Sequence, residues 1–413
     1  MPFSNQQFQK SDRLESLRYE IRGPVYERAL YLQQQGYKIT QLNIGNPAAF
    51  GFDTPDEIVH DIIANIREAQ GYADSRGLFA ARKAVMQYYQ SIGVKNTQIE
   101  DVYIGNGVSE LIVLSMQALL NPGDEVLLPA PDYPLWTTAV GLCGGKPVHY
   151  LCDEKNDWNP NLKDLESKIT DRTKAIVIIN PNNPTGAVYD KQIVENIVKL
   201  AESKGLILFS DEIYDKILYD DAQHHSVAPM VENTLGVTFG GLSKNYRAAG
   251  FRGGWFILTG AKHRAKSYTE GLTLLASMRL CSNVFAQFGI QTALGGYQSI
   301  QDLVIPQGRL YRQIKLCHER LNAIDGITCT MPKGAMYVFP KIDLKQFDFK
   351  DDEDFVFQLL EEEHILVVAG SGFNYPQKNH FRVVTLPNEE ILTDAFNRIE
   401  RFFEQHRKAT LVR

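Results

Sequence analysis

Short apolar runs alternate with amphipathic segments through the middle of the 413-residue chain. Apolar residues recur at helical spacing from Ile193 to Ala201, and Gly205 ends that pattern as helix terminators commonly do. Strands and helices that alternate in this way form a mostly parallel sheet covered on both faces, so we expect an α/β fold. The predicted strands span residues 102–105, 125–129, 148–152, 175–180, 206–210, 235–239 and 255–258.

The two ends of the chain follow a different pattern. Residues 18–36 show helical spacing, with Pro24 suited to a first turn and Gly36 to the end. From about Pro306 a long helical stretch precedes strands at 336–339, 365–369 and 381–385, with a helix near 355–364, a mixture typical of an α+β unit. The predicted parts are an N-terminal arm with part of a small domain (1–50), a large domain (51–304) and a small C-terminal domain (305–413).

Composition and charge exclude several classes of protein. The net charge of −6 gives no basic surface, so we expect no nucleic-acid partner. The five cysteines form no CxxC pair, and His224-His225 has no third ligand at a suitable spacing, so we expect neither disulfides nor a metal site. The polar start and the lack of any apolar run near the ~20 residues of a membrane span favour a soluble, cytoplasmic protein without a membrane partner.

Polar sequences follow two predicted strands at the place where parallel α/β sheets bind ligands. After residue 105 the chain reads Asn106-Gly107-Val108-Ser109 and then becomes apolar at helical spacing, which predicts backbone N–H groups and a hydroxyl at a helix N-terminus, as in phosphate sites. The strand at 175–180 runs into NPNNPTG, which places Asn183 in a rigid turn. For each segment alone, the plainer explanation is structural: a capped helix for the first and a proline turn for the second.

Two further strand ends carry charged groups. Asp211 follows an apolar strand, so we expect its carboxylate to be partly desolvated and to need a cation or strong donors. Lys244 follows another such strand in a glycine-rich loop, eight residues before Arg252. A helix cap for the aspartate and a solvated charge for the lysine are the plainer interpretations of each residue taken alone.

The segments in combination resemble a known family. NPNNPTG, SDEIYD, LSKNYRAAGFRGGW and FRVVTLP occur in the order and spacing of the class I aminotransferases, which depend on pyridoxal 5′-phosphate (PLP). The resemblance extends from LNIGNP near residue 43 to Arg382 and is closest to the bacterial glutamate–pyruvate (alanine) aminotransferases. It implies PLP fold type I, in which a large domain with a mostly parallel sheet covered by helices adjoins a smaller α+β domain.

The resemblance assigns roles around the cofactor ring. Lys244 would form a Schiff base with PLP and then act as base and acid, which requires a neutral amine. Asp211 would pair with the pyridine nitrogen and keep it protonated. Tyr214 and Asn183 would bond to the ring O3′ oxygen, and Tyr133 would stack on the ring.

The resemblance also implies a phosphate site and a shared active site. Tyr72 would reach the phosphate of the neighbouring subunit, so we expect a homodimer. Gly241 departs from the family pattern, because many relatives carry a phosphate-binding serine there, and this departure puts one hydroxyl contact in doubt. The phosphate ligands implied within the chain are Arg252, the N–H groups of Gly107 and Val108, and the hydroxyls of Ser109 and Ser243.

For the substrate, Arg382 would clamp the α-carboxylate with its planar fork, and Gly45 would bring its backbone close to the same group. The expected reaction converts L-alanine and 2-oxoglutarate to pyruvate and L-glutamate, in two half-reactions through the Lys244 Schiff base and pyridoxamine phosphate. An aminotransferase for aspartate or for branched or aromatic amino acids, or a PLP-dependent C–S β-lyase, remains an alternative, because substrates can differ by only ~1–3 kcal/mol per methylene in an apolar pocket.

Such an enzyme must accept both glutamate and alanine, and Arg22, on the Ile21-Arg22-Gly23-Pro24 arm, is the candidate residue for this property. A fixed buried arginine would be left unpaired when alanine is bound, so we hypothesise that Arg22 pairs with the distal carboxylate of glutamate and swings away for alanine. Arg22→Ala should therefore lower kcat/KM for glutamate much more than for alanine. An equal loss for the two amino acids, or an unchanged enzyme that leaves Arg22 as a surface residue, would contradict the hypothesis.

Overall fold

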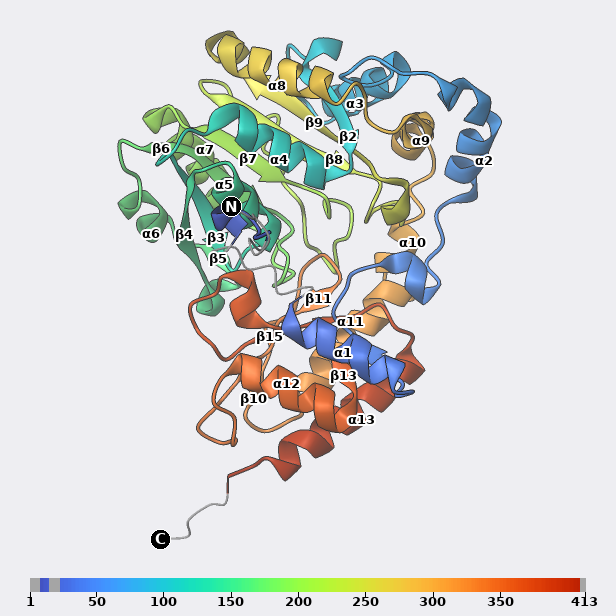
Figure 1. Cartoon of the computed structure of the whole chain (residues 1–413), viewed down its shortest axis with the longest axis vertical. Coiled ribbons are helices and arrows are strands. Elements are labelled where there is room, and N and C mark those ends of the chain that lie inside the picture. The colour runs from blue at the N-terminus through green and yellow to red at the C-terminus, as the bar shows by residue number, and fades with distance from the viewer. Residues whose placement is uncertain (1–7, 15–22, 409–413) are drawn as a thin grey trace, which may run out of the picture.

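The computed structural model of the chain describes residues 8–14 and 23–408, and the part that carries the largest sheet lies above a smaller part in the view of Figure 1. The helix predicted for residues 18–36 is seen as α1 (Pro24–Gln34), with Pro24 in its first turn. Arg22 lies outside the described residues. None of the described helices is both long and apolar enough to cross a membrane.

One sheet of eight strands forms the centre of the larger part, in the order β2-β9-β8-β7-β6-β3-β4-β5. The strands β9 and β5 run opposite to the other six. The seven strands predicted from apolar runs are all present, and the short β5 was not predicted. The bounds are β2 (Val102–Asn106), β3 (Glu125–Ala130), β4 (Lys146–Asp153), β5 (Asn159–Pro160), β6 (Thr173–Ile179), β7 (Ile207–Asp211), β8 (Leu235–Gly241) and β9 (Gly253–Gly260).

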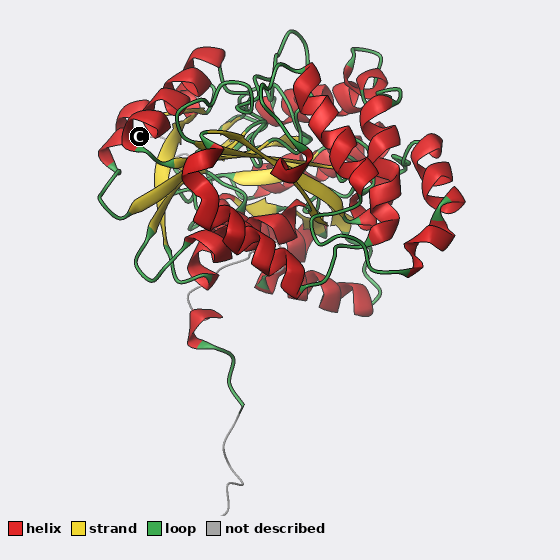
Figure 2. Ribbon diagram, turned by 90° about the horizontal axis from the view of Figure 1, so that it is seen from above, coloured by secondary structure: helices red, strands yellow, loops and turns green. Residues whose placement is uncertain are grey.

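Helices cover both faces of this sheet, as Figure 2 shows. In β6, Ala175, Val177 and Ile179 pack with α4, α5 and α8, while Ile176 and Ile178 pack with α6 and α7 on the other face. The predicted α/β fold is therefore confirmed, and its apolar strands are those of a sheet buried on two sides. The bounds are α2 (Asp56–Ala64), α3 (Phe79–Ser91), α4 (Val108–Leu119), α5 (Pro134–Leu142), α6 (Leu162–Ser167), α7 (Lys191–Lys204), α8 (Lys266–Met278) and α9 (Val284–Gly295).

The smaller part combines short strands with amphipathic helices around a second core. The pair β1-β13 is parallel and joins the segment before residue 50 to the C-terminal region. The three-stranded sheet β11-β15-β14 lies beside the cavity described below. The strand bounds are β1 (Thr40–Gln41), β10 (Ile327–Thr328), β11 (Tyr337–Val338), β12 (Lys341–Ile342), β13 (Ile365–Leu366), β14 (Val368–Ala369) and β15 (Phe381–Val384).

The remaining helices connect and cover these sheets. Beyond α9 the chain forms α10 (Gln301–Val304), α11 (Arg309–Asn322), α12 (Asp352–Glu363) and α13 (Glu389–Gln405). The domain boundaries at about residues 50 and 305 stay a prediction. The short 3-10 helices are Asp12–Leu14, Pro47–Phe50, Ile66–Gln70, Ile99–Asp101, Glu154–Asn156, Ala249–Phe251, Lys262–Ala265 and Gly370–Phe373.

Candidate active site

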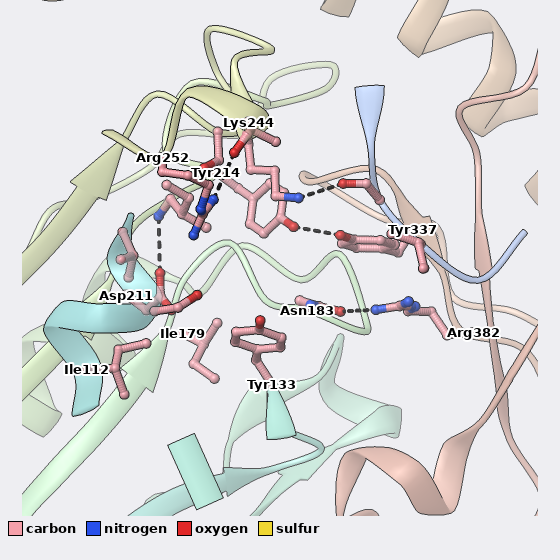
Figure 3. Close-up of a pocket in the computed structure, with 17 residues that line it drawn as sticks. Ile112, Tyr133, Ile179, Asn183, Asp211, Tyr214, Lys244, Arg252, Tyr337 and Arg382 are labelled. Atoms are coloured by element: carbon pink, nitrogen blue, oxygen red, sulfur yellow. Dashed lines mark hydrogen bonds between the residues drawn. The ribbon is translucent and has the colours of Figure 1, made fainter. Parts of the chain in front are cut away.

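The carboxyl ends of β2, β3, β6, β7 and β8 meet at one edge of the large sheet, where a cavity of about 540 Å³ opens toward β11 and β15. This volume is within the range of small-molecule sites. Most of the residues predicted from the sequence reach this cavity (Figure 3). Its lining contains Gly45, Val108, Ser109, Tyr133, Asn183, Asp211, Tyr214, Ser243, Lys244, Arg252 and Arg382, together with Ile44, Ile112, Ile179, Ile213, Ala249 and Tyr337.

Lys244 extends from the loop after β8 into the cavity. Its Nζ donates a hydrogen bond of 2.6 Å to the main-chain carbonyl of Gly45. Desolvation by burial lowers the pKa of this amine; the guanidinium groups of Arg382 and Arg252 act in the same direction, and Tyr337 and Asp211 oppose them. The environment therefore favours the neutral, nucleophilic amine more than water does.

Asp211 ends β7 and is 4% exposed. Burial raises the pKa of its carboxyl group to about 6, although hydrogen bonds to Oδ2 from the indole N–H of Trp136 (3.1 Å) and to Oδ1 from the main-chain N–H of Ile213 (3.4 Å) lower it. Among the described residues no basic side chain forms an ion pair with Asp211. A desolvated carboxylate in this position would be stabilised by a cation that enters the cavity.

Two tyrosines meet opposite Lys244. The hydroxyl oxygens of Tyr214 and Tyr337 lie 2.6 Å apart, and burial together with Tyr337 raises the pKa of Tyr214 well above its usual range. Tyr214 is therefore a neutral phenol that can donate a proton to an acceptor. The Tyr337 hydroxyl also lies 2.3 Å from where a Cβ on Gly45 would be, so this position excludes any side chain.

Arg382 lies at the other end of the cavity, on β15, and is 2% exposed. Its Nη1 donates to Oδ1 of Asn183 at 2.9 Å, and its Nη2 donates to the carbonyl of Asn43. The guanidinium carbon lies 4.6 Å from the centre of the Tyr337 ring, which gives the cation an aromatic face. The turn after β6 and the small sheet thus bring an amide and a guanidinium together, as Figure 3 shows.

A narrow cradle forms where β2 ends and α4 begins. Gly107 has φ of +79°, and a Cβ there would lie 2.3 Å from Nη2 of Arg252. Val108 begins α4, so its N–H group is among those without a partner in the first helical turn. Arg252 itself is held by the carbonyls of Ala249 (2.8 Å) and Asn106 (3.2 Å). Backbone N–H groups and a guanidinium around an open space are suited to an anion.

Gly241, where the sequence departs from the family pattern, has a structural reason in this chain. A Cβ on Gly241 would approach the Gly253 carbonyl at 3.0 Å and both Gly254 Cα and Ile213 Cδ1 at 3.2 Å. A serine at this position would be crowded by the backbone of β9. At this position β8 therefore packs closely on β9, in the space that the phosphate-binding serine of many relatives would need.

Comparison with known proteins identifies the family. A family model described as "Aminotransferase class I and II" matches residues 37–399. The chain belongs to the class I and II aminotransferases. It is 58% identical over 394 residues to the glutamate-pyruvate aminotransferase AlaA of Escherichia coli (strain K12), and the match covers 95% of this chain and 97% of that protein.

A curated relative from another organism and a solved structure agree with this assignment. The alanine aminotransferase of Mycobacterium bovis is 54% identical over 402 residues, which cover 97% of this chain and 94% of that protein. The crystal structure of an aminotransferase from Escherichia coli is 57% identical and superimposes with a TM-score of 0.96, over 98% of this chain and 100% of that one. The resemblance and the fold expected from it are thereby confirmed.

Two residues at the site of this aminotransferase were missed from the sequence, and one predicted residue lies elsewhere. Tyr337 lies in a predicted strand, but only the fold places its hydroxyl beside Tyr214. Trp136 follows Tyr133 by three residues in α5, and its N–H reaches Asp211 only because α5 packs on β7. Tyr72 is 82% exposed and lies outside the cavity of its own chain.

The buried carboxylate gives this aminotransferase a testable pH dependence. The pKa of Asp211 rises from 3.8 to about 6 on folding, so the unfolded chain loses this proton at lower pH than the folded one, and stability falls as pH rises through that window. Asp211→Asn, which keeps an acceptor for Trp136, should gain about 3 kcal/mol over the cofactor-free wild type between pH 4 and pH 8. Urea unfolding across this range measures the difference, and a constant difference would contradict the burial argument.

Proposed function

We propose that this aminotransferase transfers the amino group of L-alanine to 2-oxoglutarate, forming pyruvate and L-glutamate, with PLP as its cofactor. The observation that carries the substrate assignment is the 58% identity, over nearly the whole chain, to a glutamate-pyruvate aminotransferase. The alanine aminotransferase at 54% identity supports the same assignment. The cavity supports the cofactor assignment independently, because the charged and hydrogen-bonding groups of its lining match those of PLP.

The donor set of the cavity fits PLP at three separate points. Asp211 is a buried carboxylate without an ion pair among the described residues, which suits a protonated ring nitrogen. The cradle of Gly107, Val108 and Arg252 suits a phosphate group. Lys244 is an amine with a lowered pKa, which suits reaction with an aldehyde. Bound PLP supplies an electron sink for the electrons released at the amino-acid Cα.

The remaining steps belong to side chains of the protein. We propose that Arg382 binds the α-carboxylate of the amino acid with its planar fork, while Asn183 holds the guanidinium in place through their 2.9 Å bond. In this arrangement Nζ of Lys244 would take a proton from Cα of the substrate and deliver it to the former aldehyde carbon of the cofactor, so that the amino group remains on the cofactor when the oxo acid leaves. Tyr214 donates its phenolic hydrogen toward the cofactor oxygen, and its contact with Tyr337 fixes the direction of the hydroxyl.

The surface near the cavity supports a homodimer with shared active sites. Large apolar side chains are exposed around the start of α3 and the junction of α8 and α9, where Ser75 bonds to Ser277 and Arg279. Tyr72 lies within this group, which is consistent with its proposed contact to the phosphate bound by the neighbouring subunit. The exposed residues are Ile63, Ile66, Tyr72, Phe79, Leu274, Met278, Leu280 and Phe285.

The dimer is tested by placing charge on this surface. Phe79→Glu combined with Met278→Glu should convert a dimer into monomers in sedimentation velocity, because two carboxylates would be buried without partners. The activity should fall with the dimer fraction if Tyr72 completes the neighbouring site. Phe357→Glu, at an apolar residue of α12 that is 45% exposed, is the control and should stay dimeric. A wild-type chain that sediments as a monomer would rule out the shared site.

A half-reaction tests the proposed function. The purified protein loaded with PLP is mixed separately with L-alanine, L-glutamate, L-aspartate and L-leucine, without any oxo acid, and the visible absorbance is followed. Alanine and glutamate should convert the cofactor to pyridoxamine phosphate, and aspartate and leucine should scarcely do so. Conversion by a different pair would contradict the alanine–glutamate assignment. Release of pyruvate and ammonia from cysteine-type substrates, with no pyridoxamine formed, would identify a lyase.

A further inference from the structure

The two loops that carry Tyr214 and Lys244 leave the sheet from neighbouring strands. The ladder between β7 and β8 ends where Asp211 pairs with Phe239, with a final bond from Glu212 N–H to the Phe239 carbonyl at 3.1 Å. Beyond that bond the sheet no longer fixes the distance between the loops. The relative position of Tyr214 and Lys244 therefore depends on contacts made outside the ladder.

A direct side-chain bond joins the loops one residue further along each chain segment. Nδ2 of Asn245 donates to Oδ1 of Asp215 at 2.5 Å, and Asn245 is 4% exposed. The second oxygen of the carboxylate, Oδ2, accepts from the Tyr88 hydroxyl at 3.0 Å, which ties the pair to α3. Asp215 follows Tyr214 and Asn245 follows Lys244, so the bond joins the two loops directly beside the two proposed site residues.

A second link runs between the next residues of the same loops. Nζ of Lys216 donates to Oε1 of Gln298 at 2.6 Å, and the Tyr246 hydroxyl donates to the same oxygen at 3.1 Å. Lys216 also lies over the rings of Tyr88 and Tyr246, with its Nζ 4.9 and 5.6 Å from their centres. Two consecutive residues on each loop are thus joined across the gap, one pair directly and one pair through Gln298.

Asp215 accepts a hydrogen bond through each of its two carboxyl oxygens. Burial and the neighbouring Glu212 raise the pKa of Asp215, while His224, Lys216 and the hydrogen bond from Asn245 offset part of this rise. An amide that donates to a carboxylate makes a stronger bond than one between neutral groups. A buried bond of this kind resists the opening of the two loops, because opening would leave both partners without hydrogen bonds away from water.

We propose that Asp215 and Asn245 form a clasp that positions Lys244 and Tyr214 relative to each other in the active site. The inference rests on the proposed function, since it gives the clasp a purpose only if these two residues act on the same bound group. Neither clasp residue lines the cavity, so both are positioning residues. Misplacement of reacting groups by about 1 Å can lower a rate by about 100-fold, so loss of a bond at this location can lower kcat strongly.

Substitutions at the two positions separate positioning from stability. Asn245→Ala and Asp215→Ala each remove the bond, and each should lower kcat with alanine by about 10-fold or more while KM changes little, because binding through Arg382 is retained. The double variant should lose no more than Asp215→Ala, since the bond between the loops is already lost in that single variant and the bond from Tyr88 is lost in both. Asp215→Asn keeps an oxygen to accept from Asn245 and should stay within about 3-fold of the wild type.

The visible circular dichroism per bound PLP gives a readout other than activity. A cofactor held at a fixed angle by the protein has an induced signal, and both alanine variants should weaken it, whereas Asp215→Asn should not. Asn159→Ala is the matched control, because Asn159 is also buried and bonds to an aspartate, Asp190, at the far edge of the sheet (3.2 Å). It should lower the urea midpoint and leave both kcat and the dichroism unchanged.

The possible outcomes distinguish the clasp from the function on which it rests. Losses that multiply in the double variant, or a dichroism signal that stays at the wild-type level in both alanine variants, would contradict the clasp. If Asp215→Ala does not fold, Asn245→Ala compared with Asp215→Asn decides the question alone: equal kcat in the two would overturn the inference. A wild-type protein without any visible band in the presence of PLP would contradict the proposed function, and the clasp would fall with it.

Discussion

The desolvation of one carboxylate is the constraint on which the site depends. Both faces of the large sheet are covered by helices, so the groups that must meet a ligand gather where the parallel strands end. Asp211 ends such a strand, and burial raises its pKa to about 6 despite the bond from Trp136. A charge in this environment has a favourable free energy only when a cation is beside it, and a protonated pyridine ring would provide that cation.

Lys244 is the basic counterpart of Asp211 in the cavity, because its charged form is also disfavoured by the surroundings. Burial and the nearby guanidinium groups of Arg382 and Arg252 lower the pKa of its amine, so the proton that a nucleophile must lose is already held less tightly. The carboxylate that suits a ring nitrogen and the amine that suits an aldehyde come from adjacent strands. The small sheet contributes Arg382 and Tyr337 across the cavity, so both parts of the chain form its lining.

The sequence predicted the framework of the site because the strands of the large sheet are apolar runs and several polar residues of the cavity directly follow such a run. Asp211, Lys244 and Asn183 could be found in this way. Tyr337 and Trp136 could not, because their contacts with Tyr214 and Asp211 join segments far apart in sequence. Two-residue strands such as β5 carry too short a pattern to be predicted. The bond between Asp215 and Asn245 could not be predicted either. The two residues are far apart in sequence, and neither directly follows its strand.

The most direct test of the central claim is to find where PLP attaches. The protein loaded with PLP would be reduced with borohydride, digested and analysed by peptide mass spectrometry, with Lys244→Ala as the comparison. The account predicts a phosphopyridoxyl group on Lys244, in the peptide that contains Ser243 and Asn245, and no such group in the variant. Attachment to another lysine in the wild type, or the same yield in Lys244→Ala, would contradict the assignment of the cavity as the PLP site.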